Sequence, residues 1–460
     1  MAGATRAIAD FSWNGRPVGA PEAAIDLAIR SLIDTLGVLF AGRQDESVDS
    51  VLSAAASNAE LSGDATILVD GRRSDPATAA LINGTAAHAL DFDLGGLTQQ
   101  HPGAVIWPAV LAVGEAADVS GKQLVEAAIV GFEVAAGVAA GMDMRGHYER
   151  WHATATVSRF GAAMAVGRLM GLNPDQLRCA LGITASMAAG SRQNFGTMTK
   201  PLHAGLAAQS GVFAAEIAAH DFTADMDQLE APQGFFSMYS PGPNPQGTIQ
   251  SLANPWALLN RGLSMKAYPC CYSAHRAIAG TIALRTQIPR VDEVDSINVT
   301  FEPNGLESLI HHSPVDGTEG KFSAEYLIAA ALLDGGIALS SFTGEALARP
   351  ELRRLMSRVR VSEAQRPPIG PPGFERFYAV VEISFGHDKA TTRVDSLPSD
   401  KMATAPLDLL ENKFRDCIAY SGLAVDPARL LREIWTIQEV ASCRELSLFS
   451  ACSVAARDNR

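Results

Sequence analysis

The chain has 460 residues, of which 47% are hydrophobic and 19% charged, and its formal net charge at pH 7 is −13. This is the composition of a globular protein, and the length exceeds what one hydrophobic core usually supports, so we expect two domains. The negative charge argues against a nucleic acid or an anionic membrane as the main partner. An anionic substrate would therefore need a local cluster of positive charge.

The N-terminus and the cysteines predict a cytoplasmic protein. Charged residues interrupt the first ten positions, which therefore lack the apolar stretch of a signal peptide. The most apolar run, residues 127–142, contains Glu133 and is too short to span a membrane, so we expect no membrane passage. The six cysteines form no C-x-x-C pair, which indicates reduced thiols, at positions 179, 270, 271, 417, 443 and 452.

Helical periodicity dominates the chain from Pro21 to about Asp221. Apolar residues recur at spacings of three and four from Ile25 to Leu39, and Pro21 suits a first helical turn. The same period predicts further helices over residues 77–90, 105–117, 124–140, 154–170 and 203–219. Many of their residues are small, which favours close packing of helix on helix.

Beyond Lys266 the pattern changes to a mixture of strands and helices. Alternation predicts strands over residues 295–301, 357–361 and 377–385, and helical stretches over 268–287, 323–334 and 341–348. Helical periodicity resumes from 405 to 436. We therefore predict a mainly α fold: a helical domain made of residues 1–265 and 403–460, with an α+β lid domain, residues 266–402, inserted before the C-terminal helices. The seam of such an insertion would be a usual place for a small-molecule site.

A lysine and a histidine lie three residues apart at a predicted helix start. Lys200 precedes Pro201, which favours a first helical turn, and the free N–H groups of a helix N-terminus attract anions such as a carboxylate. A solvated loop lysine fits this motif equally well. His203 lies among alanines, where a histidine often only caps or packs.

Further titratable residues border other predicted helices. Asp91 and His101 flank one loop, where the carboxylate would orient the imidazole, although Asp91 as a turn former and His101 as a helix cap fit equally. His152 opens a helix, and His275 follows Cys270 and Cys271, which lack other signs of thiol catalysis. We expect no metal, because the spacing of zinc motifs is missing, and no nucleotide cofactor, because no glycine-rich phosphate loop occurs. Cofactor-free acid–base chemistry remains.

Several ordered blocks of residues resemble one known family. They are Leu90-Asp-Phe-Asp93 with His101-Pro102, Gly196 to Gly205, Leu229-Glu230 with Gly234-Phe235, Lys266 to Pro269 with His275, and Ser323 to Tyr326. Together they resemble the MmgE/PrpD family, which includes 2-methylcitrate dehydratase, cis-aconitate decarboxylase and iminodisuccinate epimerase. The resemblance implies a helical body with an α+β lid, a homodimer and no cofactor. It also implies that the pocket contains Asp91, His101, His152, Lys200, His275 and Tyr326, with His203 at its edge.

The resemblance leads to a functional hypothesis. Lys200, His275 and Arg192 would anchor the carboxylates of a di- or tricarboxylate substrate, while His101 and His152, oriented by Asp91, act as acid and base. Tyr326 would donate a proton to a leaving hydroxyl. We expect a lyase that dehydrates a 2-methylcitrate-like acid. The alternatives are a cis-aconitate-type decarboxylase, an iminodisuccinate-type epimerase and, from another class, a non-catalytic carboxylate-binding protein.

One segment departs from the family pattern. Relatives often read Asp-Phe-Asp-Asp-Thr, whereas here Asp93 is followed by Leu94 and Gly95. The chain therefore lacks one carboxylate and one hydroxyl beside the presumed proton-handling loop. This difference bears on the substrate and the reaction more than on the fold, and it keeps the epimerase alternative open.

Overall fold

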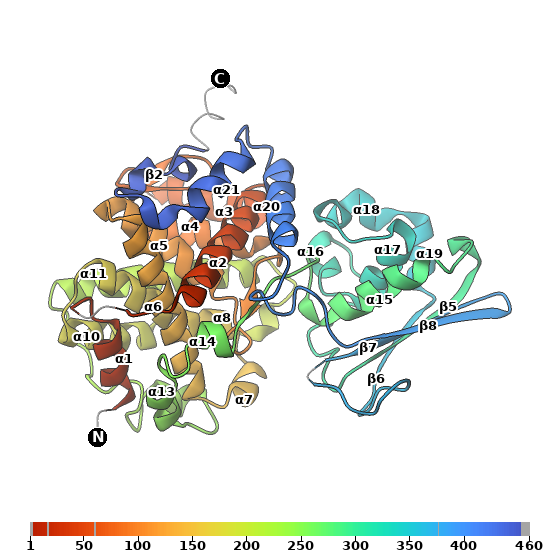
Figure 1. Ribbon diagram of the computed structural model, residues 1–460, viewed down its shortest axis with the longest axis horizontal. Coiled ribbons are helices and arrows are strands. Elements are labelled where there is room, and N and C mark those ends of the chain that lie inside the picture. Colours follow the sequence, from red (N-terminus) through yellow and green to blue (C-terminus); the bar gives the residue numbers. More distant parts are fainter. Residues whose placement is uncertain (1–2, 16–17, 59–60, 376, 452–460) are drawn as a thin grey trace. The chain divides into compact units, whose positions relative to one another are not determined.

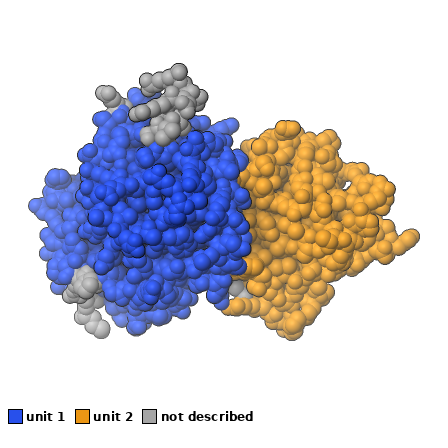
Figure 2. All heavy atoms as spheres, turned by 45° about the horizontal axis from the view of Figure 1, so that its top comes forward, with its two compact units in different colours: residues 1–194, 198–265, 401–460 blue, residues 195–197, 266–400 orange. Residues whose placement is uncertain are grey.

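The computed structural model describes residues 3–15, 18–58, 61–375 and 377–451 (Figure 1). The chain folds as two compact units, coloured separately in Figure 2. The helical unit comprises residues 1–194, 198–265 and 401–460, and the mixed unit comprises residues 195–197 and 266–400. The prediction of a mainly α protein is confirmed. The arrangement of the α+β part as a lid stays a prediction.

The helical unit contains most of the helices of the chain. Two short antiparallel strand pairs accompany them, β1 (Ala65–Thr66) with β2 (Arg73–Ser74) and β3 (Gly95–Gly96) with β4 (Leu263–Ser264). The helices are α1 (Ala4–Ser12), α2 (Glu22–Gly42), α3 (Glu46–Asn58), α4 (Pro76–Ala89), α5 (Gly103–Ala117), α6 (Gly121–Ala140), α7 (Met144–Tyr148), α8 (Ala153–Thr156), α9 (Ser158–Leu169), α10 (Pro174–Ser186), α11 (Thr199–Ala219), α12 (Phe235–Tyr239), α13 (Pro245–Ser251), α14 (Ala257–Asn260), α20 (Leu407–Ser421) and α21 (Pro427–Trp435).

Glycines let α4 and α11 pack backbone against backbone in the core of the helical unit. A Cβ atom on Gly205 of α11 would lie 2.3 Å from the carbonyl oxygen of Leu81, and one on Gly84 of α4 would lie 3.0 Å from the Cα of Gly205. The first distance is shorter than real Cβ contacts allow and the second is at their lower limit, so glycine at these positions permits the close approach. The contact fixes the C-terminal end of α4 relative to the first turns of α11, and these two regions carry the candidate site.

Helix α6 lies in the core of the same unit. By length and composition it could cross a membrane, but 83% of its most apolar window is buried inside the protein, as in the core helix of a folded domain. Its buried Glu133 accepts hydrogen bonds from the main-chain N–H groups of Ala257 (2.9 Å) and Leu258 (3.1 Å). The carboxylate thereby caps the start of α14, which explains a charge inside an apolar helix.

The mixed unit is built on a four-stranded sheet of order β6-β5-β7-β8. Strand β5 (Val294–Phe301) pairs parallel with β6 (Val359–Glu363) and antiparallel with β7 (Ala379–Phe385), which pairs antiparallel with β8 (Asp388–Val394). The helices of this unit are α15 (His275–Arg285), α16 (Gly317–Gly320), α17 (Ala324–Asp334), α18 (Gly344–Ala348) and α19 (Pro350–Met356). The alternating burial of β5 shows that one face of this strand packs against the core.

Three predicted helices differ from the structure. The helix expected over 268–287 begins only at His275, because the N–H groups of Cys270 and Cys271 donate to Tyr268 and Lys321 outside any helix. The stretch 341–348 is a 3₁₀ turn followed by the short α18, and the stretch 154–170 is divided between α8 and α9 at Val157. Cys179, Cys417 and Cys443 are free thiols, whereas Cys452 lies outside the described residues.

Candidate active site

A buried ion pair joins the loop after α4 to the first turn of α11. Lys200 Nζ contacts the Asp91 carboxylate, and the two side chains are only 6% and 5% exposed. Lys200 lies in the first turn of α11, whereas the sequence predicts it at or just before a helix that spans residues 203–219. Asp91 has φ +50°, a left-handed conformation that aspartate tolerates better than most residues, and this turns the chain directly after the helix.

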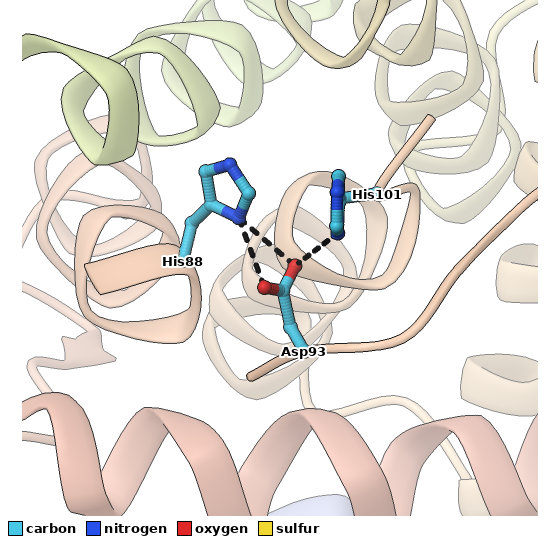
Figure 3. A group of neighbouring side chains, drawn as sticks. All are labelled: His88, Asp93 and His101. Carbon is cyan, nitrogen blue, oxygen red and sulfur yellow. Dashed lines mark hydrogen bonds and ion pairs between the residues drawn. The ribbon is translucent and has the colours of Figure 1, made fainter. Parts of the chain in front are cut away.

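A second carboxylate, Asp93, lies between two imidazoles (Figure 3). His88 Nδ1 is 3.0 Å from both carboxylate oxygens, and His101 Nδ1 is 3.2 Å from Oδ2. Burial would raise the pKa of Asp93, but the charges and hydrogen bonds of the two imidazoles outweigh it and hold that pKa well below its usual range. Asp93 is therefore an anion held inside the protein.

Two further imidazoles continue this cluster. His152 Nδ1 lies 3.2 Å from His203 Nδ1, and the His152 ring stacks on the His88 ring with centroids 5.5 Å apart. Burial, reinforced by the charge of Lys200, lowers the pKa of His203 to about 4 and the pKa of His152 well below its usual range. Both rings are neutral at pH 7, so they can donate or accept hydrogen bonds without competing with Lys200 for an anion.

The loop that carries the two aspartates is anchored from the C-terminal part of the chain. Lys413 of α20 donates to Asp34 Oδ1 (2.7 Å) and to the carbonyl oxygen of Phe92 (2.6 Å). Asp34 of α2 in turn accepts from the N–H of Leu94 (2.9 Å). Burial raises the pKa of Asp34, although the charge of Lys413 opposes this. Residues 91–94 are thus tied to α2 and α20.

A cavity of about 480 Å³ in the helical unit borders this cluster at His203. Its wall also contains Arg159, Ser191, Gln209 and Phe213. The Arg159 guanidinium is held by the main-chain oxygens of three residues, and burial lowers its pKa to about 10. The cavity therefore offers a mostly apolar space with one buried cation beside the histidines.

Comparison with known proteins identifies the family. The model of the MmgE/PrpD N-terminal domain matches residues 6–248, and that of the C-terminal domain matches residues 268–436. The chain belongs to the MmgE/PrpD family. Curated relatives are named cis-aconitate decarboxylase: the human protein is 28% identical over 93% of this chain and 90% of its own length. The mouse protein is 28% identical over 84% and 80%, and one from Aspergillus terreus is 24% identical over 93% and 91%.

The structure corrects the partner assigned to Asp91. The sequence hypothesis has Asp91 orienting His101 and His152, but the carboxylate in contact with His101 is Asp93, and the ion pair of Asp91 is with Lys200. Asp91 adopts a left-handed backbone conformation, and the carboxylates of Asp91 and Asp93, two positions apart, contact different partners. Sequence reasoning also missed His88 as a site residue. Its position in the last turn of α4, two residues before the family's aspartate block, is the signal that points to it.

The predicted residues fall into three places. Asp91, His101, His152, Lys200 and His203 gather in the helical unit, whereas His275 and Tyr326 lie in the mixed unit. Arg192 lies in a 3₁₀ turn of the helical unit, where its guanidinium is 4.4 Å from the centre of the Tyr148 ring and donates to the Tyr148 carbonyl oxygen. The observed cluster thus contains five of the eight predicted residues and adds His88 and Asp93.

The two predicted residues of the mixed unit differ in their surroundings. His275 is fully buried at the start of α15, its Nε2 is 3.3 Å from the carbonyl oxygen of Cys270, and the rings of Tyr268 and Tyr272 pack against it. Tyr326 is also fully buried, and its hydroxyl donates to the Ser341 carbonyl oxygen. Burial raises the Tyr326 pKa to about 12. Because this hydroxyl is already engaged inside its own unit, Tyr326 is not part of the mechanism proposed below.

One group of side chains has the composition of a metal site. The ligand atoms of His88, Asp93 and His101 lie within 4.8 Å of one another. Two imidazoles and a carboxylate are ligands that zinc accepts. Hydrogen bonds with His88 and the 3.2 Å ion-pair contact with His101 also satisfy the carboxylate, and the sequence predicts no metal. We therefore treat the three residues as a carboxylate held between two imidazoles.

Proposed function

We propose that this protein is a cofactor-independent decarboxylase that acts on an unsaturated tricarboxylate such as cis-aconitate. The observation that carries the proposal is the match, along nine-tenths of the chain, to relatives named cis-aconitate decarboxylase. The comparisons thus favour the decarboxylase alternative over the dehydratase that the sequence hypothesis put first. A buried lysine beside several imidazoles supports the same reaction class.

The reaction sets two physical requirements. The bond from a CH₂ carbon to its carboxylate breaks and releases CO₂, and the electron pair moves to form a new double bond. One carbon of the former double bond then takes up a proton, so that the atoms and charges balance. The site must therefore hold several carboxylates, stabilise negative charge that spreads onto one of them, and deliver one proton.

The helical unit contains groups suited to each requirement. Lys200 supplies a fixed positive charge in the first turn of α11, where the helix N-terminus also favours an anion. His101, with its Nδ1 toward Asp93, presents Nε2 as the nitrogen that transfers a proton, and the ionised Asp93 would stabilise the imidazolium. His152 and His203 are neutral and would orient substrate oxygens by hydrogen bonding. His275 remains a predicted carboxylate ligand from the mixed unit.

The departure from the family pattern is consistent with a reaction that has no leaving hydroxyl. Leu94 is fully buried with its N–H bound to Asp34, and Gly95 pairs with Ser264 in the β3–β4 ladder. These two positions therefore offer no side-chain donor to protonate a departing oxygen, as a dehydratase requires.

The test is proton NMR of the purified protein incubated separately with cis-aconitate, 2-methylcitrate and iminodisuccinate in D₂O, with released CO₂ measured in parallel. We expect a five-carbon unsaturated dicarboxylate and stoichiometric CO₂ from cis-aconitate. An alkene formed from 2-methylcitrate without CO₂ would instead establish a dehydratase. Deuterium entering iminodisuccinate with its skeleton unchanged would establish an epimerase, and either result would overturn the proposal.

A further inference from the structure

His88 is a buried histidine to which neither the sequence hypothesis nor the family names give a role. It lies in the last turn of α4, it is 1% exposed, and its Nδ1 reaches both oxygens of Asp93. We propose that His88 is a positioning residue, which holds Asp93 in the orientation that fixes the Nδ1–H tautomer of His101 and leaves His101 Nε2 for the substrate. This role rests on the proposed function, because it acts through His101.

The geometry of the carboxylate carries the first step of the argument. Asp93 is fully buried, and its Oδ2 is shared between His88 (3.0 Å) and His101 (3.2 Å) (Figure 3). A carboxylate with a single partner could rotate about its side-chain bonds. The contact of His88 with both oxygens restricts that rotation, so Oδ2 stays in place for His101.

The protonation state of His88 makes it a donor to Asp93. Burial lowers the pKa of His88 to about 4, even though the nearby Asp93 raises it. A neutral imidazole carries one proton, and an Nδ1 that faces an anionic carboxylate must hold that proton to make a hydrogen bond. His88 is therefore an uncharged donor that leaves the negative charge of Asp93 available to His101. Lys200 and His152 also lie close to His88 within the helical unit.

The second nitrogen of His88 shows that a purely structural role is a poor explanation. His88 Nε2 is buried and has no hydrogen-bond partner among the described residues. A buried acceptor without a partner is costly, and an apolar residue of similar size would avoid this cost. The hydrogen bond from His88 Nδ1 to Asp93 explains why an imidazole stands at this position. Its ring is held by stacking on His152, with planes 22° apart.

Two substitutions of His88 separate the effect of its hydrogen-bond donor from the effect of its side-chain volume. In His88→Asn the side-chain amide can still donate to Asp93 from about the position of Nδ1, whereas His88→Leu fills similar space without a donor. For cis-aconitate turnover we expect His88→Leu to lower kcat by about 10²-fold with little change in KM, the loss typical of a misplaced catalytic group. His88→Asn should retain most of the activity. His220→Asn, at an exposed histidine, is the matched control.

A spectroscopic measurement tests the role without any turnover. In protein labelled with ¹⁵N-histidine and free of substrate, the imidazole nitrogen shifts report the tautomer of each of the ten histidines, and a His101→Gln spectrum assigns the His101 signal. We expect the Nδ1–H form of His101 in the wild type and in His88→Asn, and a mixture of tautomers in His88→Leu. A His101 tautomer unchanged in His88→Leu would overturn the proposal. So would equal kcat in the two His88 variants. If the protein does not act on cis-aconitate, the NMR result still decides the role of His88.

Discussion

Two buried lysine–aspartate pairs contact the same short segment, residues 91–94, and their surroundings differ. In the first pair, Lys413 also donates to the main-chain oxygen of Phe92, and Asp34 also accepts from the N–H of Leu94. Lys413 Nζ lies 4.0 Å from the centre of the Phe92 ring. The pair of Lys200 and Asp91 lies near imidazoles whose pKa values are lowered by burial and, in part, by the charge of Lys200. Burial of an ion pair alone therefore does not identify a functional site.

The difference follows from what each pair can offer a ligand. A buried pair stabilises little by itself, since desolvation offsets most of the attraction, so its value lies in what it positions. Lys413 and Asp34 fix the loop backbone. Lys200 combines a positive charge with neutral histidines close by, which is the combination that carboxylate chemistry needs. The comparison predicts that one pair controls turnover and the other controls stability.

The largest effect is expected at Lys200. Lys200→Met should lower kcat/KM for cis-aconitate by about 10³-fold, because fixed positive charge is lost where negative charge develops. The change also removes the buried ion pair with Asp91, so the melting temperature should fall. The double variant Asp91→Asn/Lys200→Met should recover the melting temperature but not the activity. Wild-type turnover in Lys200→Met would contradict the prediction that the Lys200–Asp91 pair controls turnover.

The opposite result is expected at Lys413. Lys413→Met removes the partner of the fully buried Asp34 and should lower the free energy of unfolding by about 3–5 kcal/mol, measured by urea denaturation. Activity per folded molecule should fall much less than in Lys200→Met, because the described contacts of Lys413 are with Asp34 and Phe92 and not with the histidine cluster. A loss of kcat as large as that of Lys200→Met, in protein shown to be folded by circular dichroism, would show that the two pairs do not divide the roles.

The sequence predicts the helical framework well and the sheet less completely. Apolar residues at helical spacing indicate α2, α4, α5, α6 and α11, which the structure buries on nearly all sides. Strand β8 was missed because it is a polar edge strand: Asp388, Lys389 and Thr391 are exposed, and only Ala390 is buried. Such a strand has no apolar alternation to detect, and its partner β7 supplies the pairing.

The candidate site shows a similar limit. The sequence places Lys200 at or just before a helix N-terminus, because proline preference and helix periodicity are local properties. It does not determine which aspartate of Asp91-Phe-Asp93 meets which base, because that depends on the left-handed turn at Asp91 and on partners far along the chain, such as Lys413. His88 was missed because its importance comes from its contact with Asp93 and the stacking on His152.

A smaller effect is expected where α4 meets α11. Gly205→Ala would place a Cβ atom 2.3 Å from the Leu81 carbonyl oxygen and should destabilise the helical unit by about 1–3 kcal/mol. Because both elements of the site must shift, kcat should fall along with the melting temperature, unlike in Lys413→Met. Gly344→Ala is the control, since nothing lies within 4 Å of a Cβ there. If Gly205→Ala melts like the wild type, the close approach of the two helices does not constrain the site.

The smallest effect is a pH dependence of stability that comes from His203, one of the histidines near the Lys200–Asp91 pair. The pKa of His203 is lowered to about 4 in the folded protein, below its unfolded value near 6.5, so the unfolded chain binds the proton first. The stability from this neutral histidine is complete above about pH 6.5 and is lost as the pH falls toward about 4, by at most about 1.4 kcal/mol per pH unit. His203→Gln should make the melting temperature less sensitive to acid between pH 6.5 and 5. Equal slopes for His203→Gln and the wild type would mean that His203 is not held neutral by its surroundings, and the contrast between the two pairs would then rest on turnover alone.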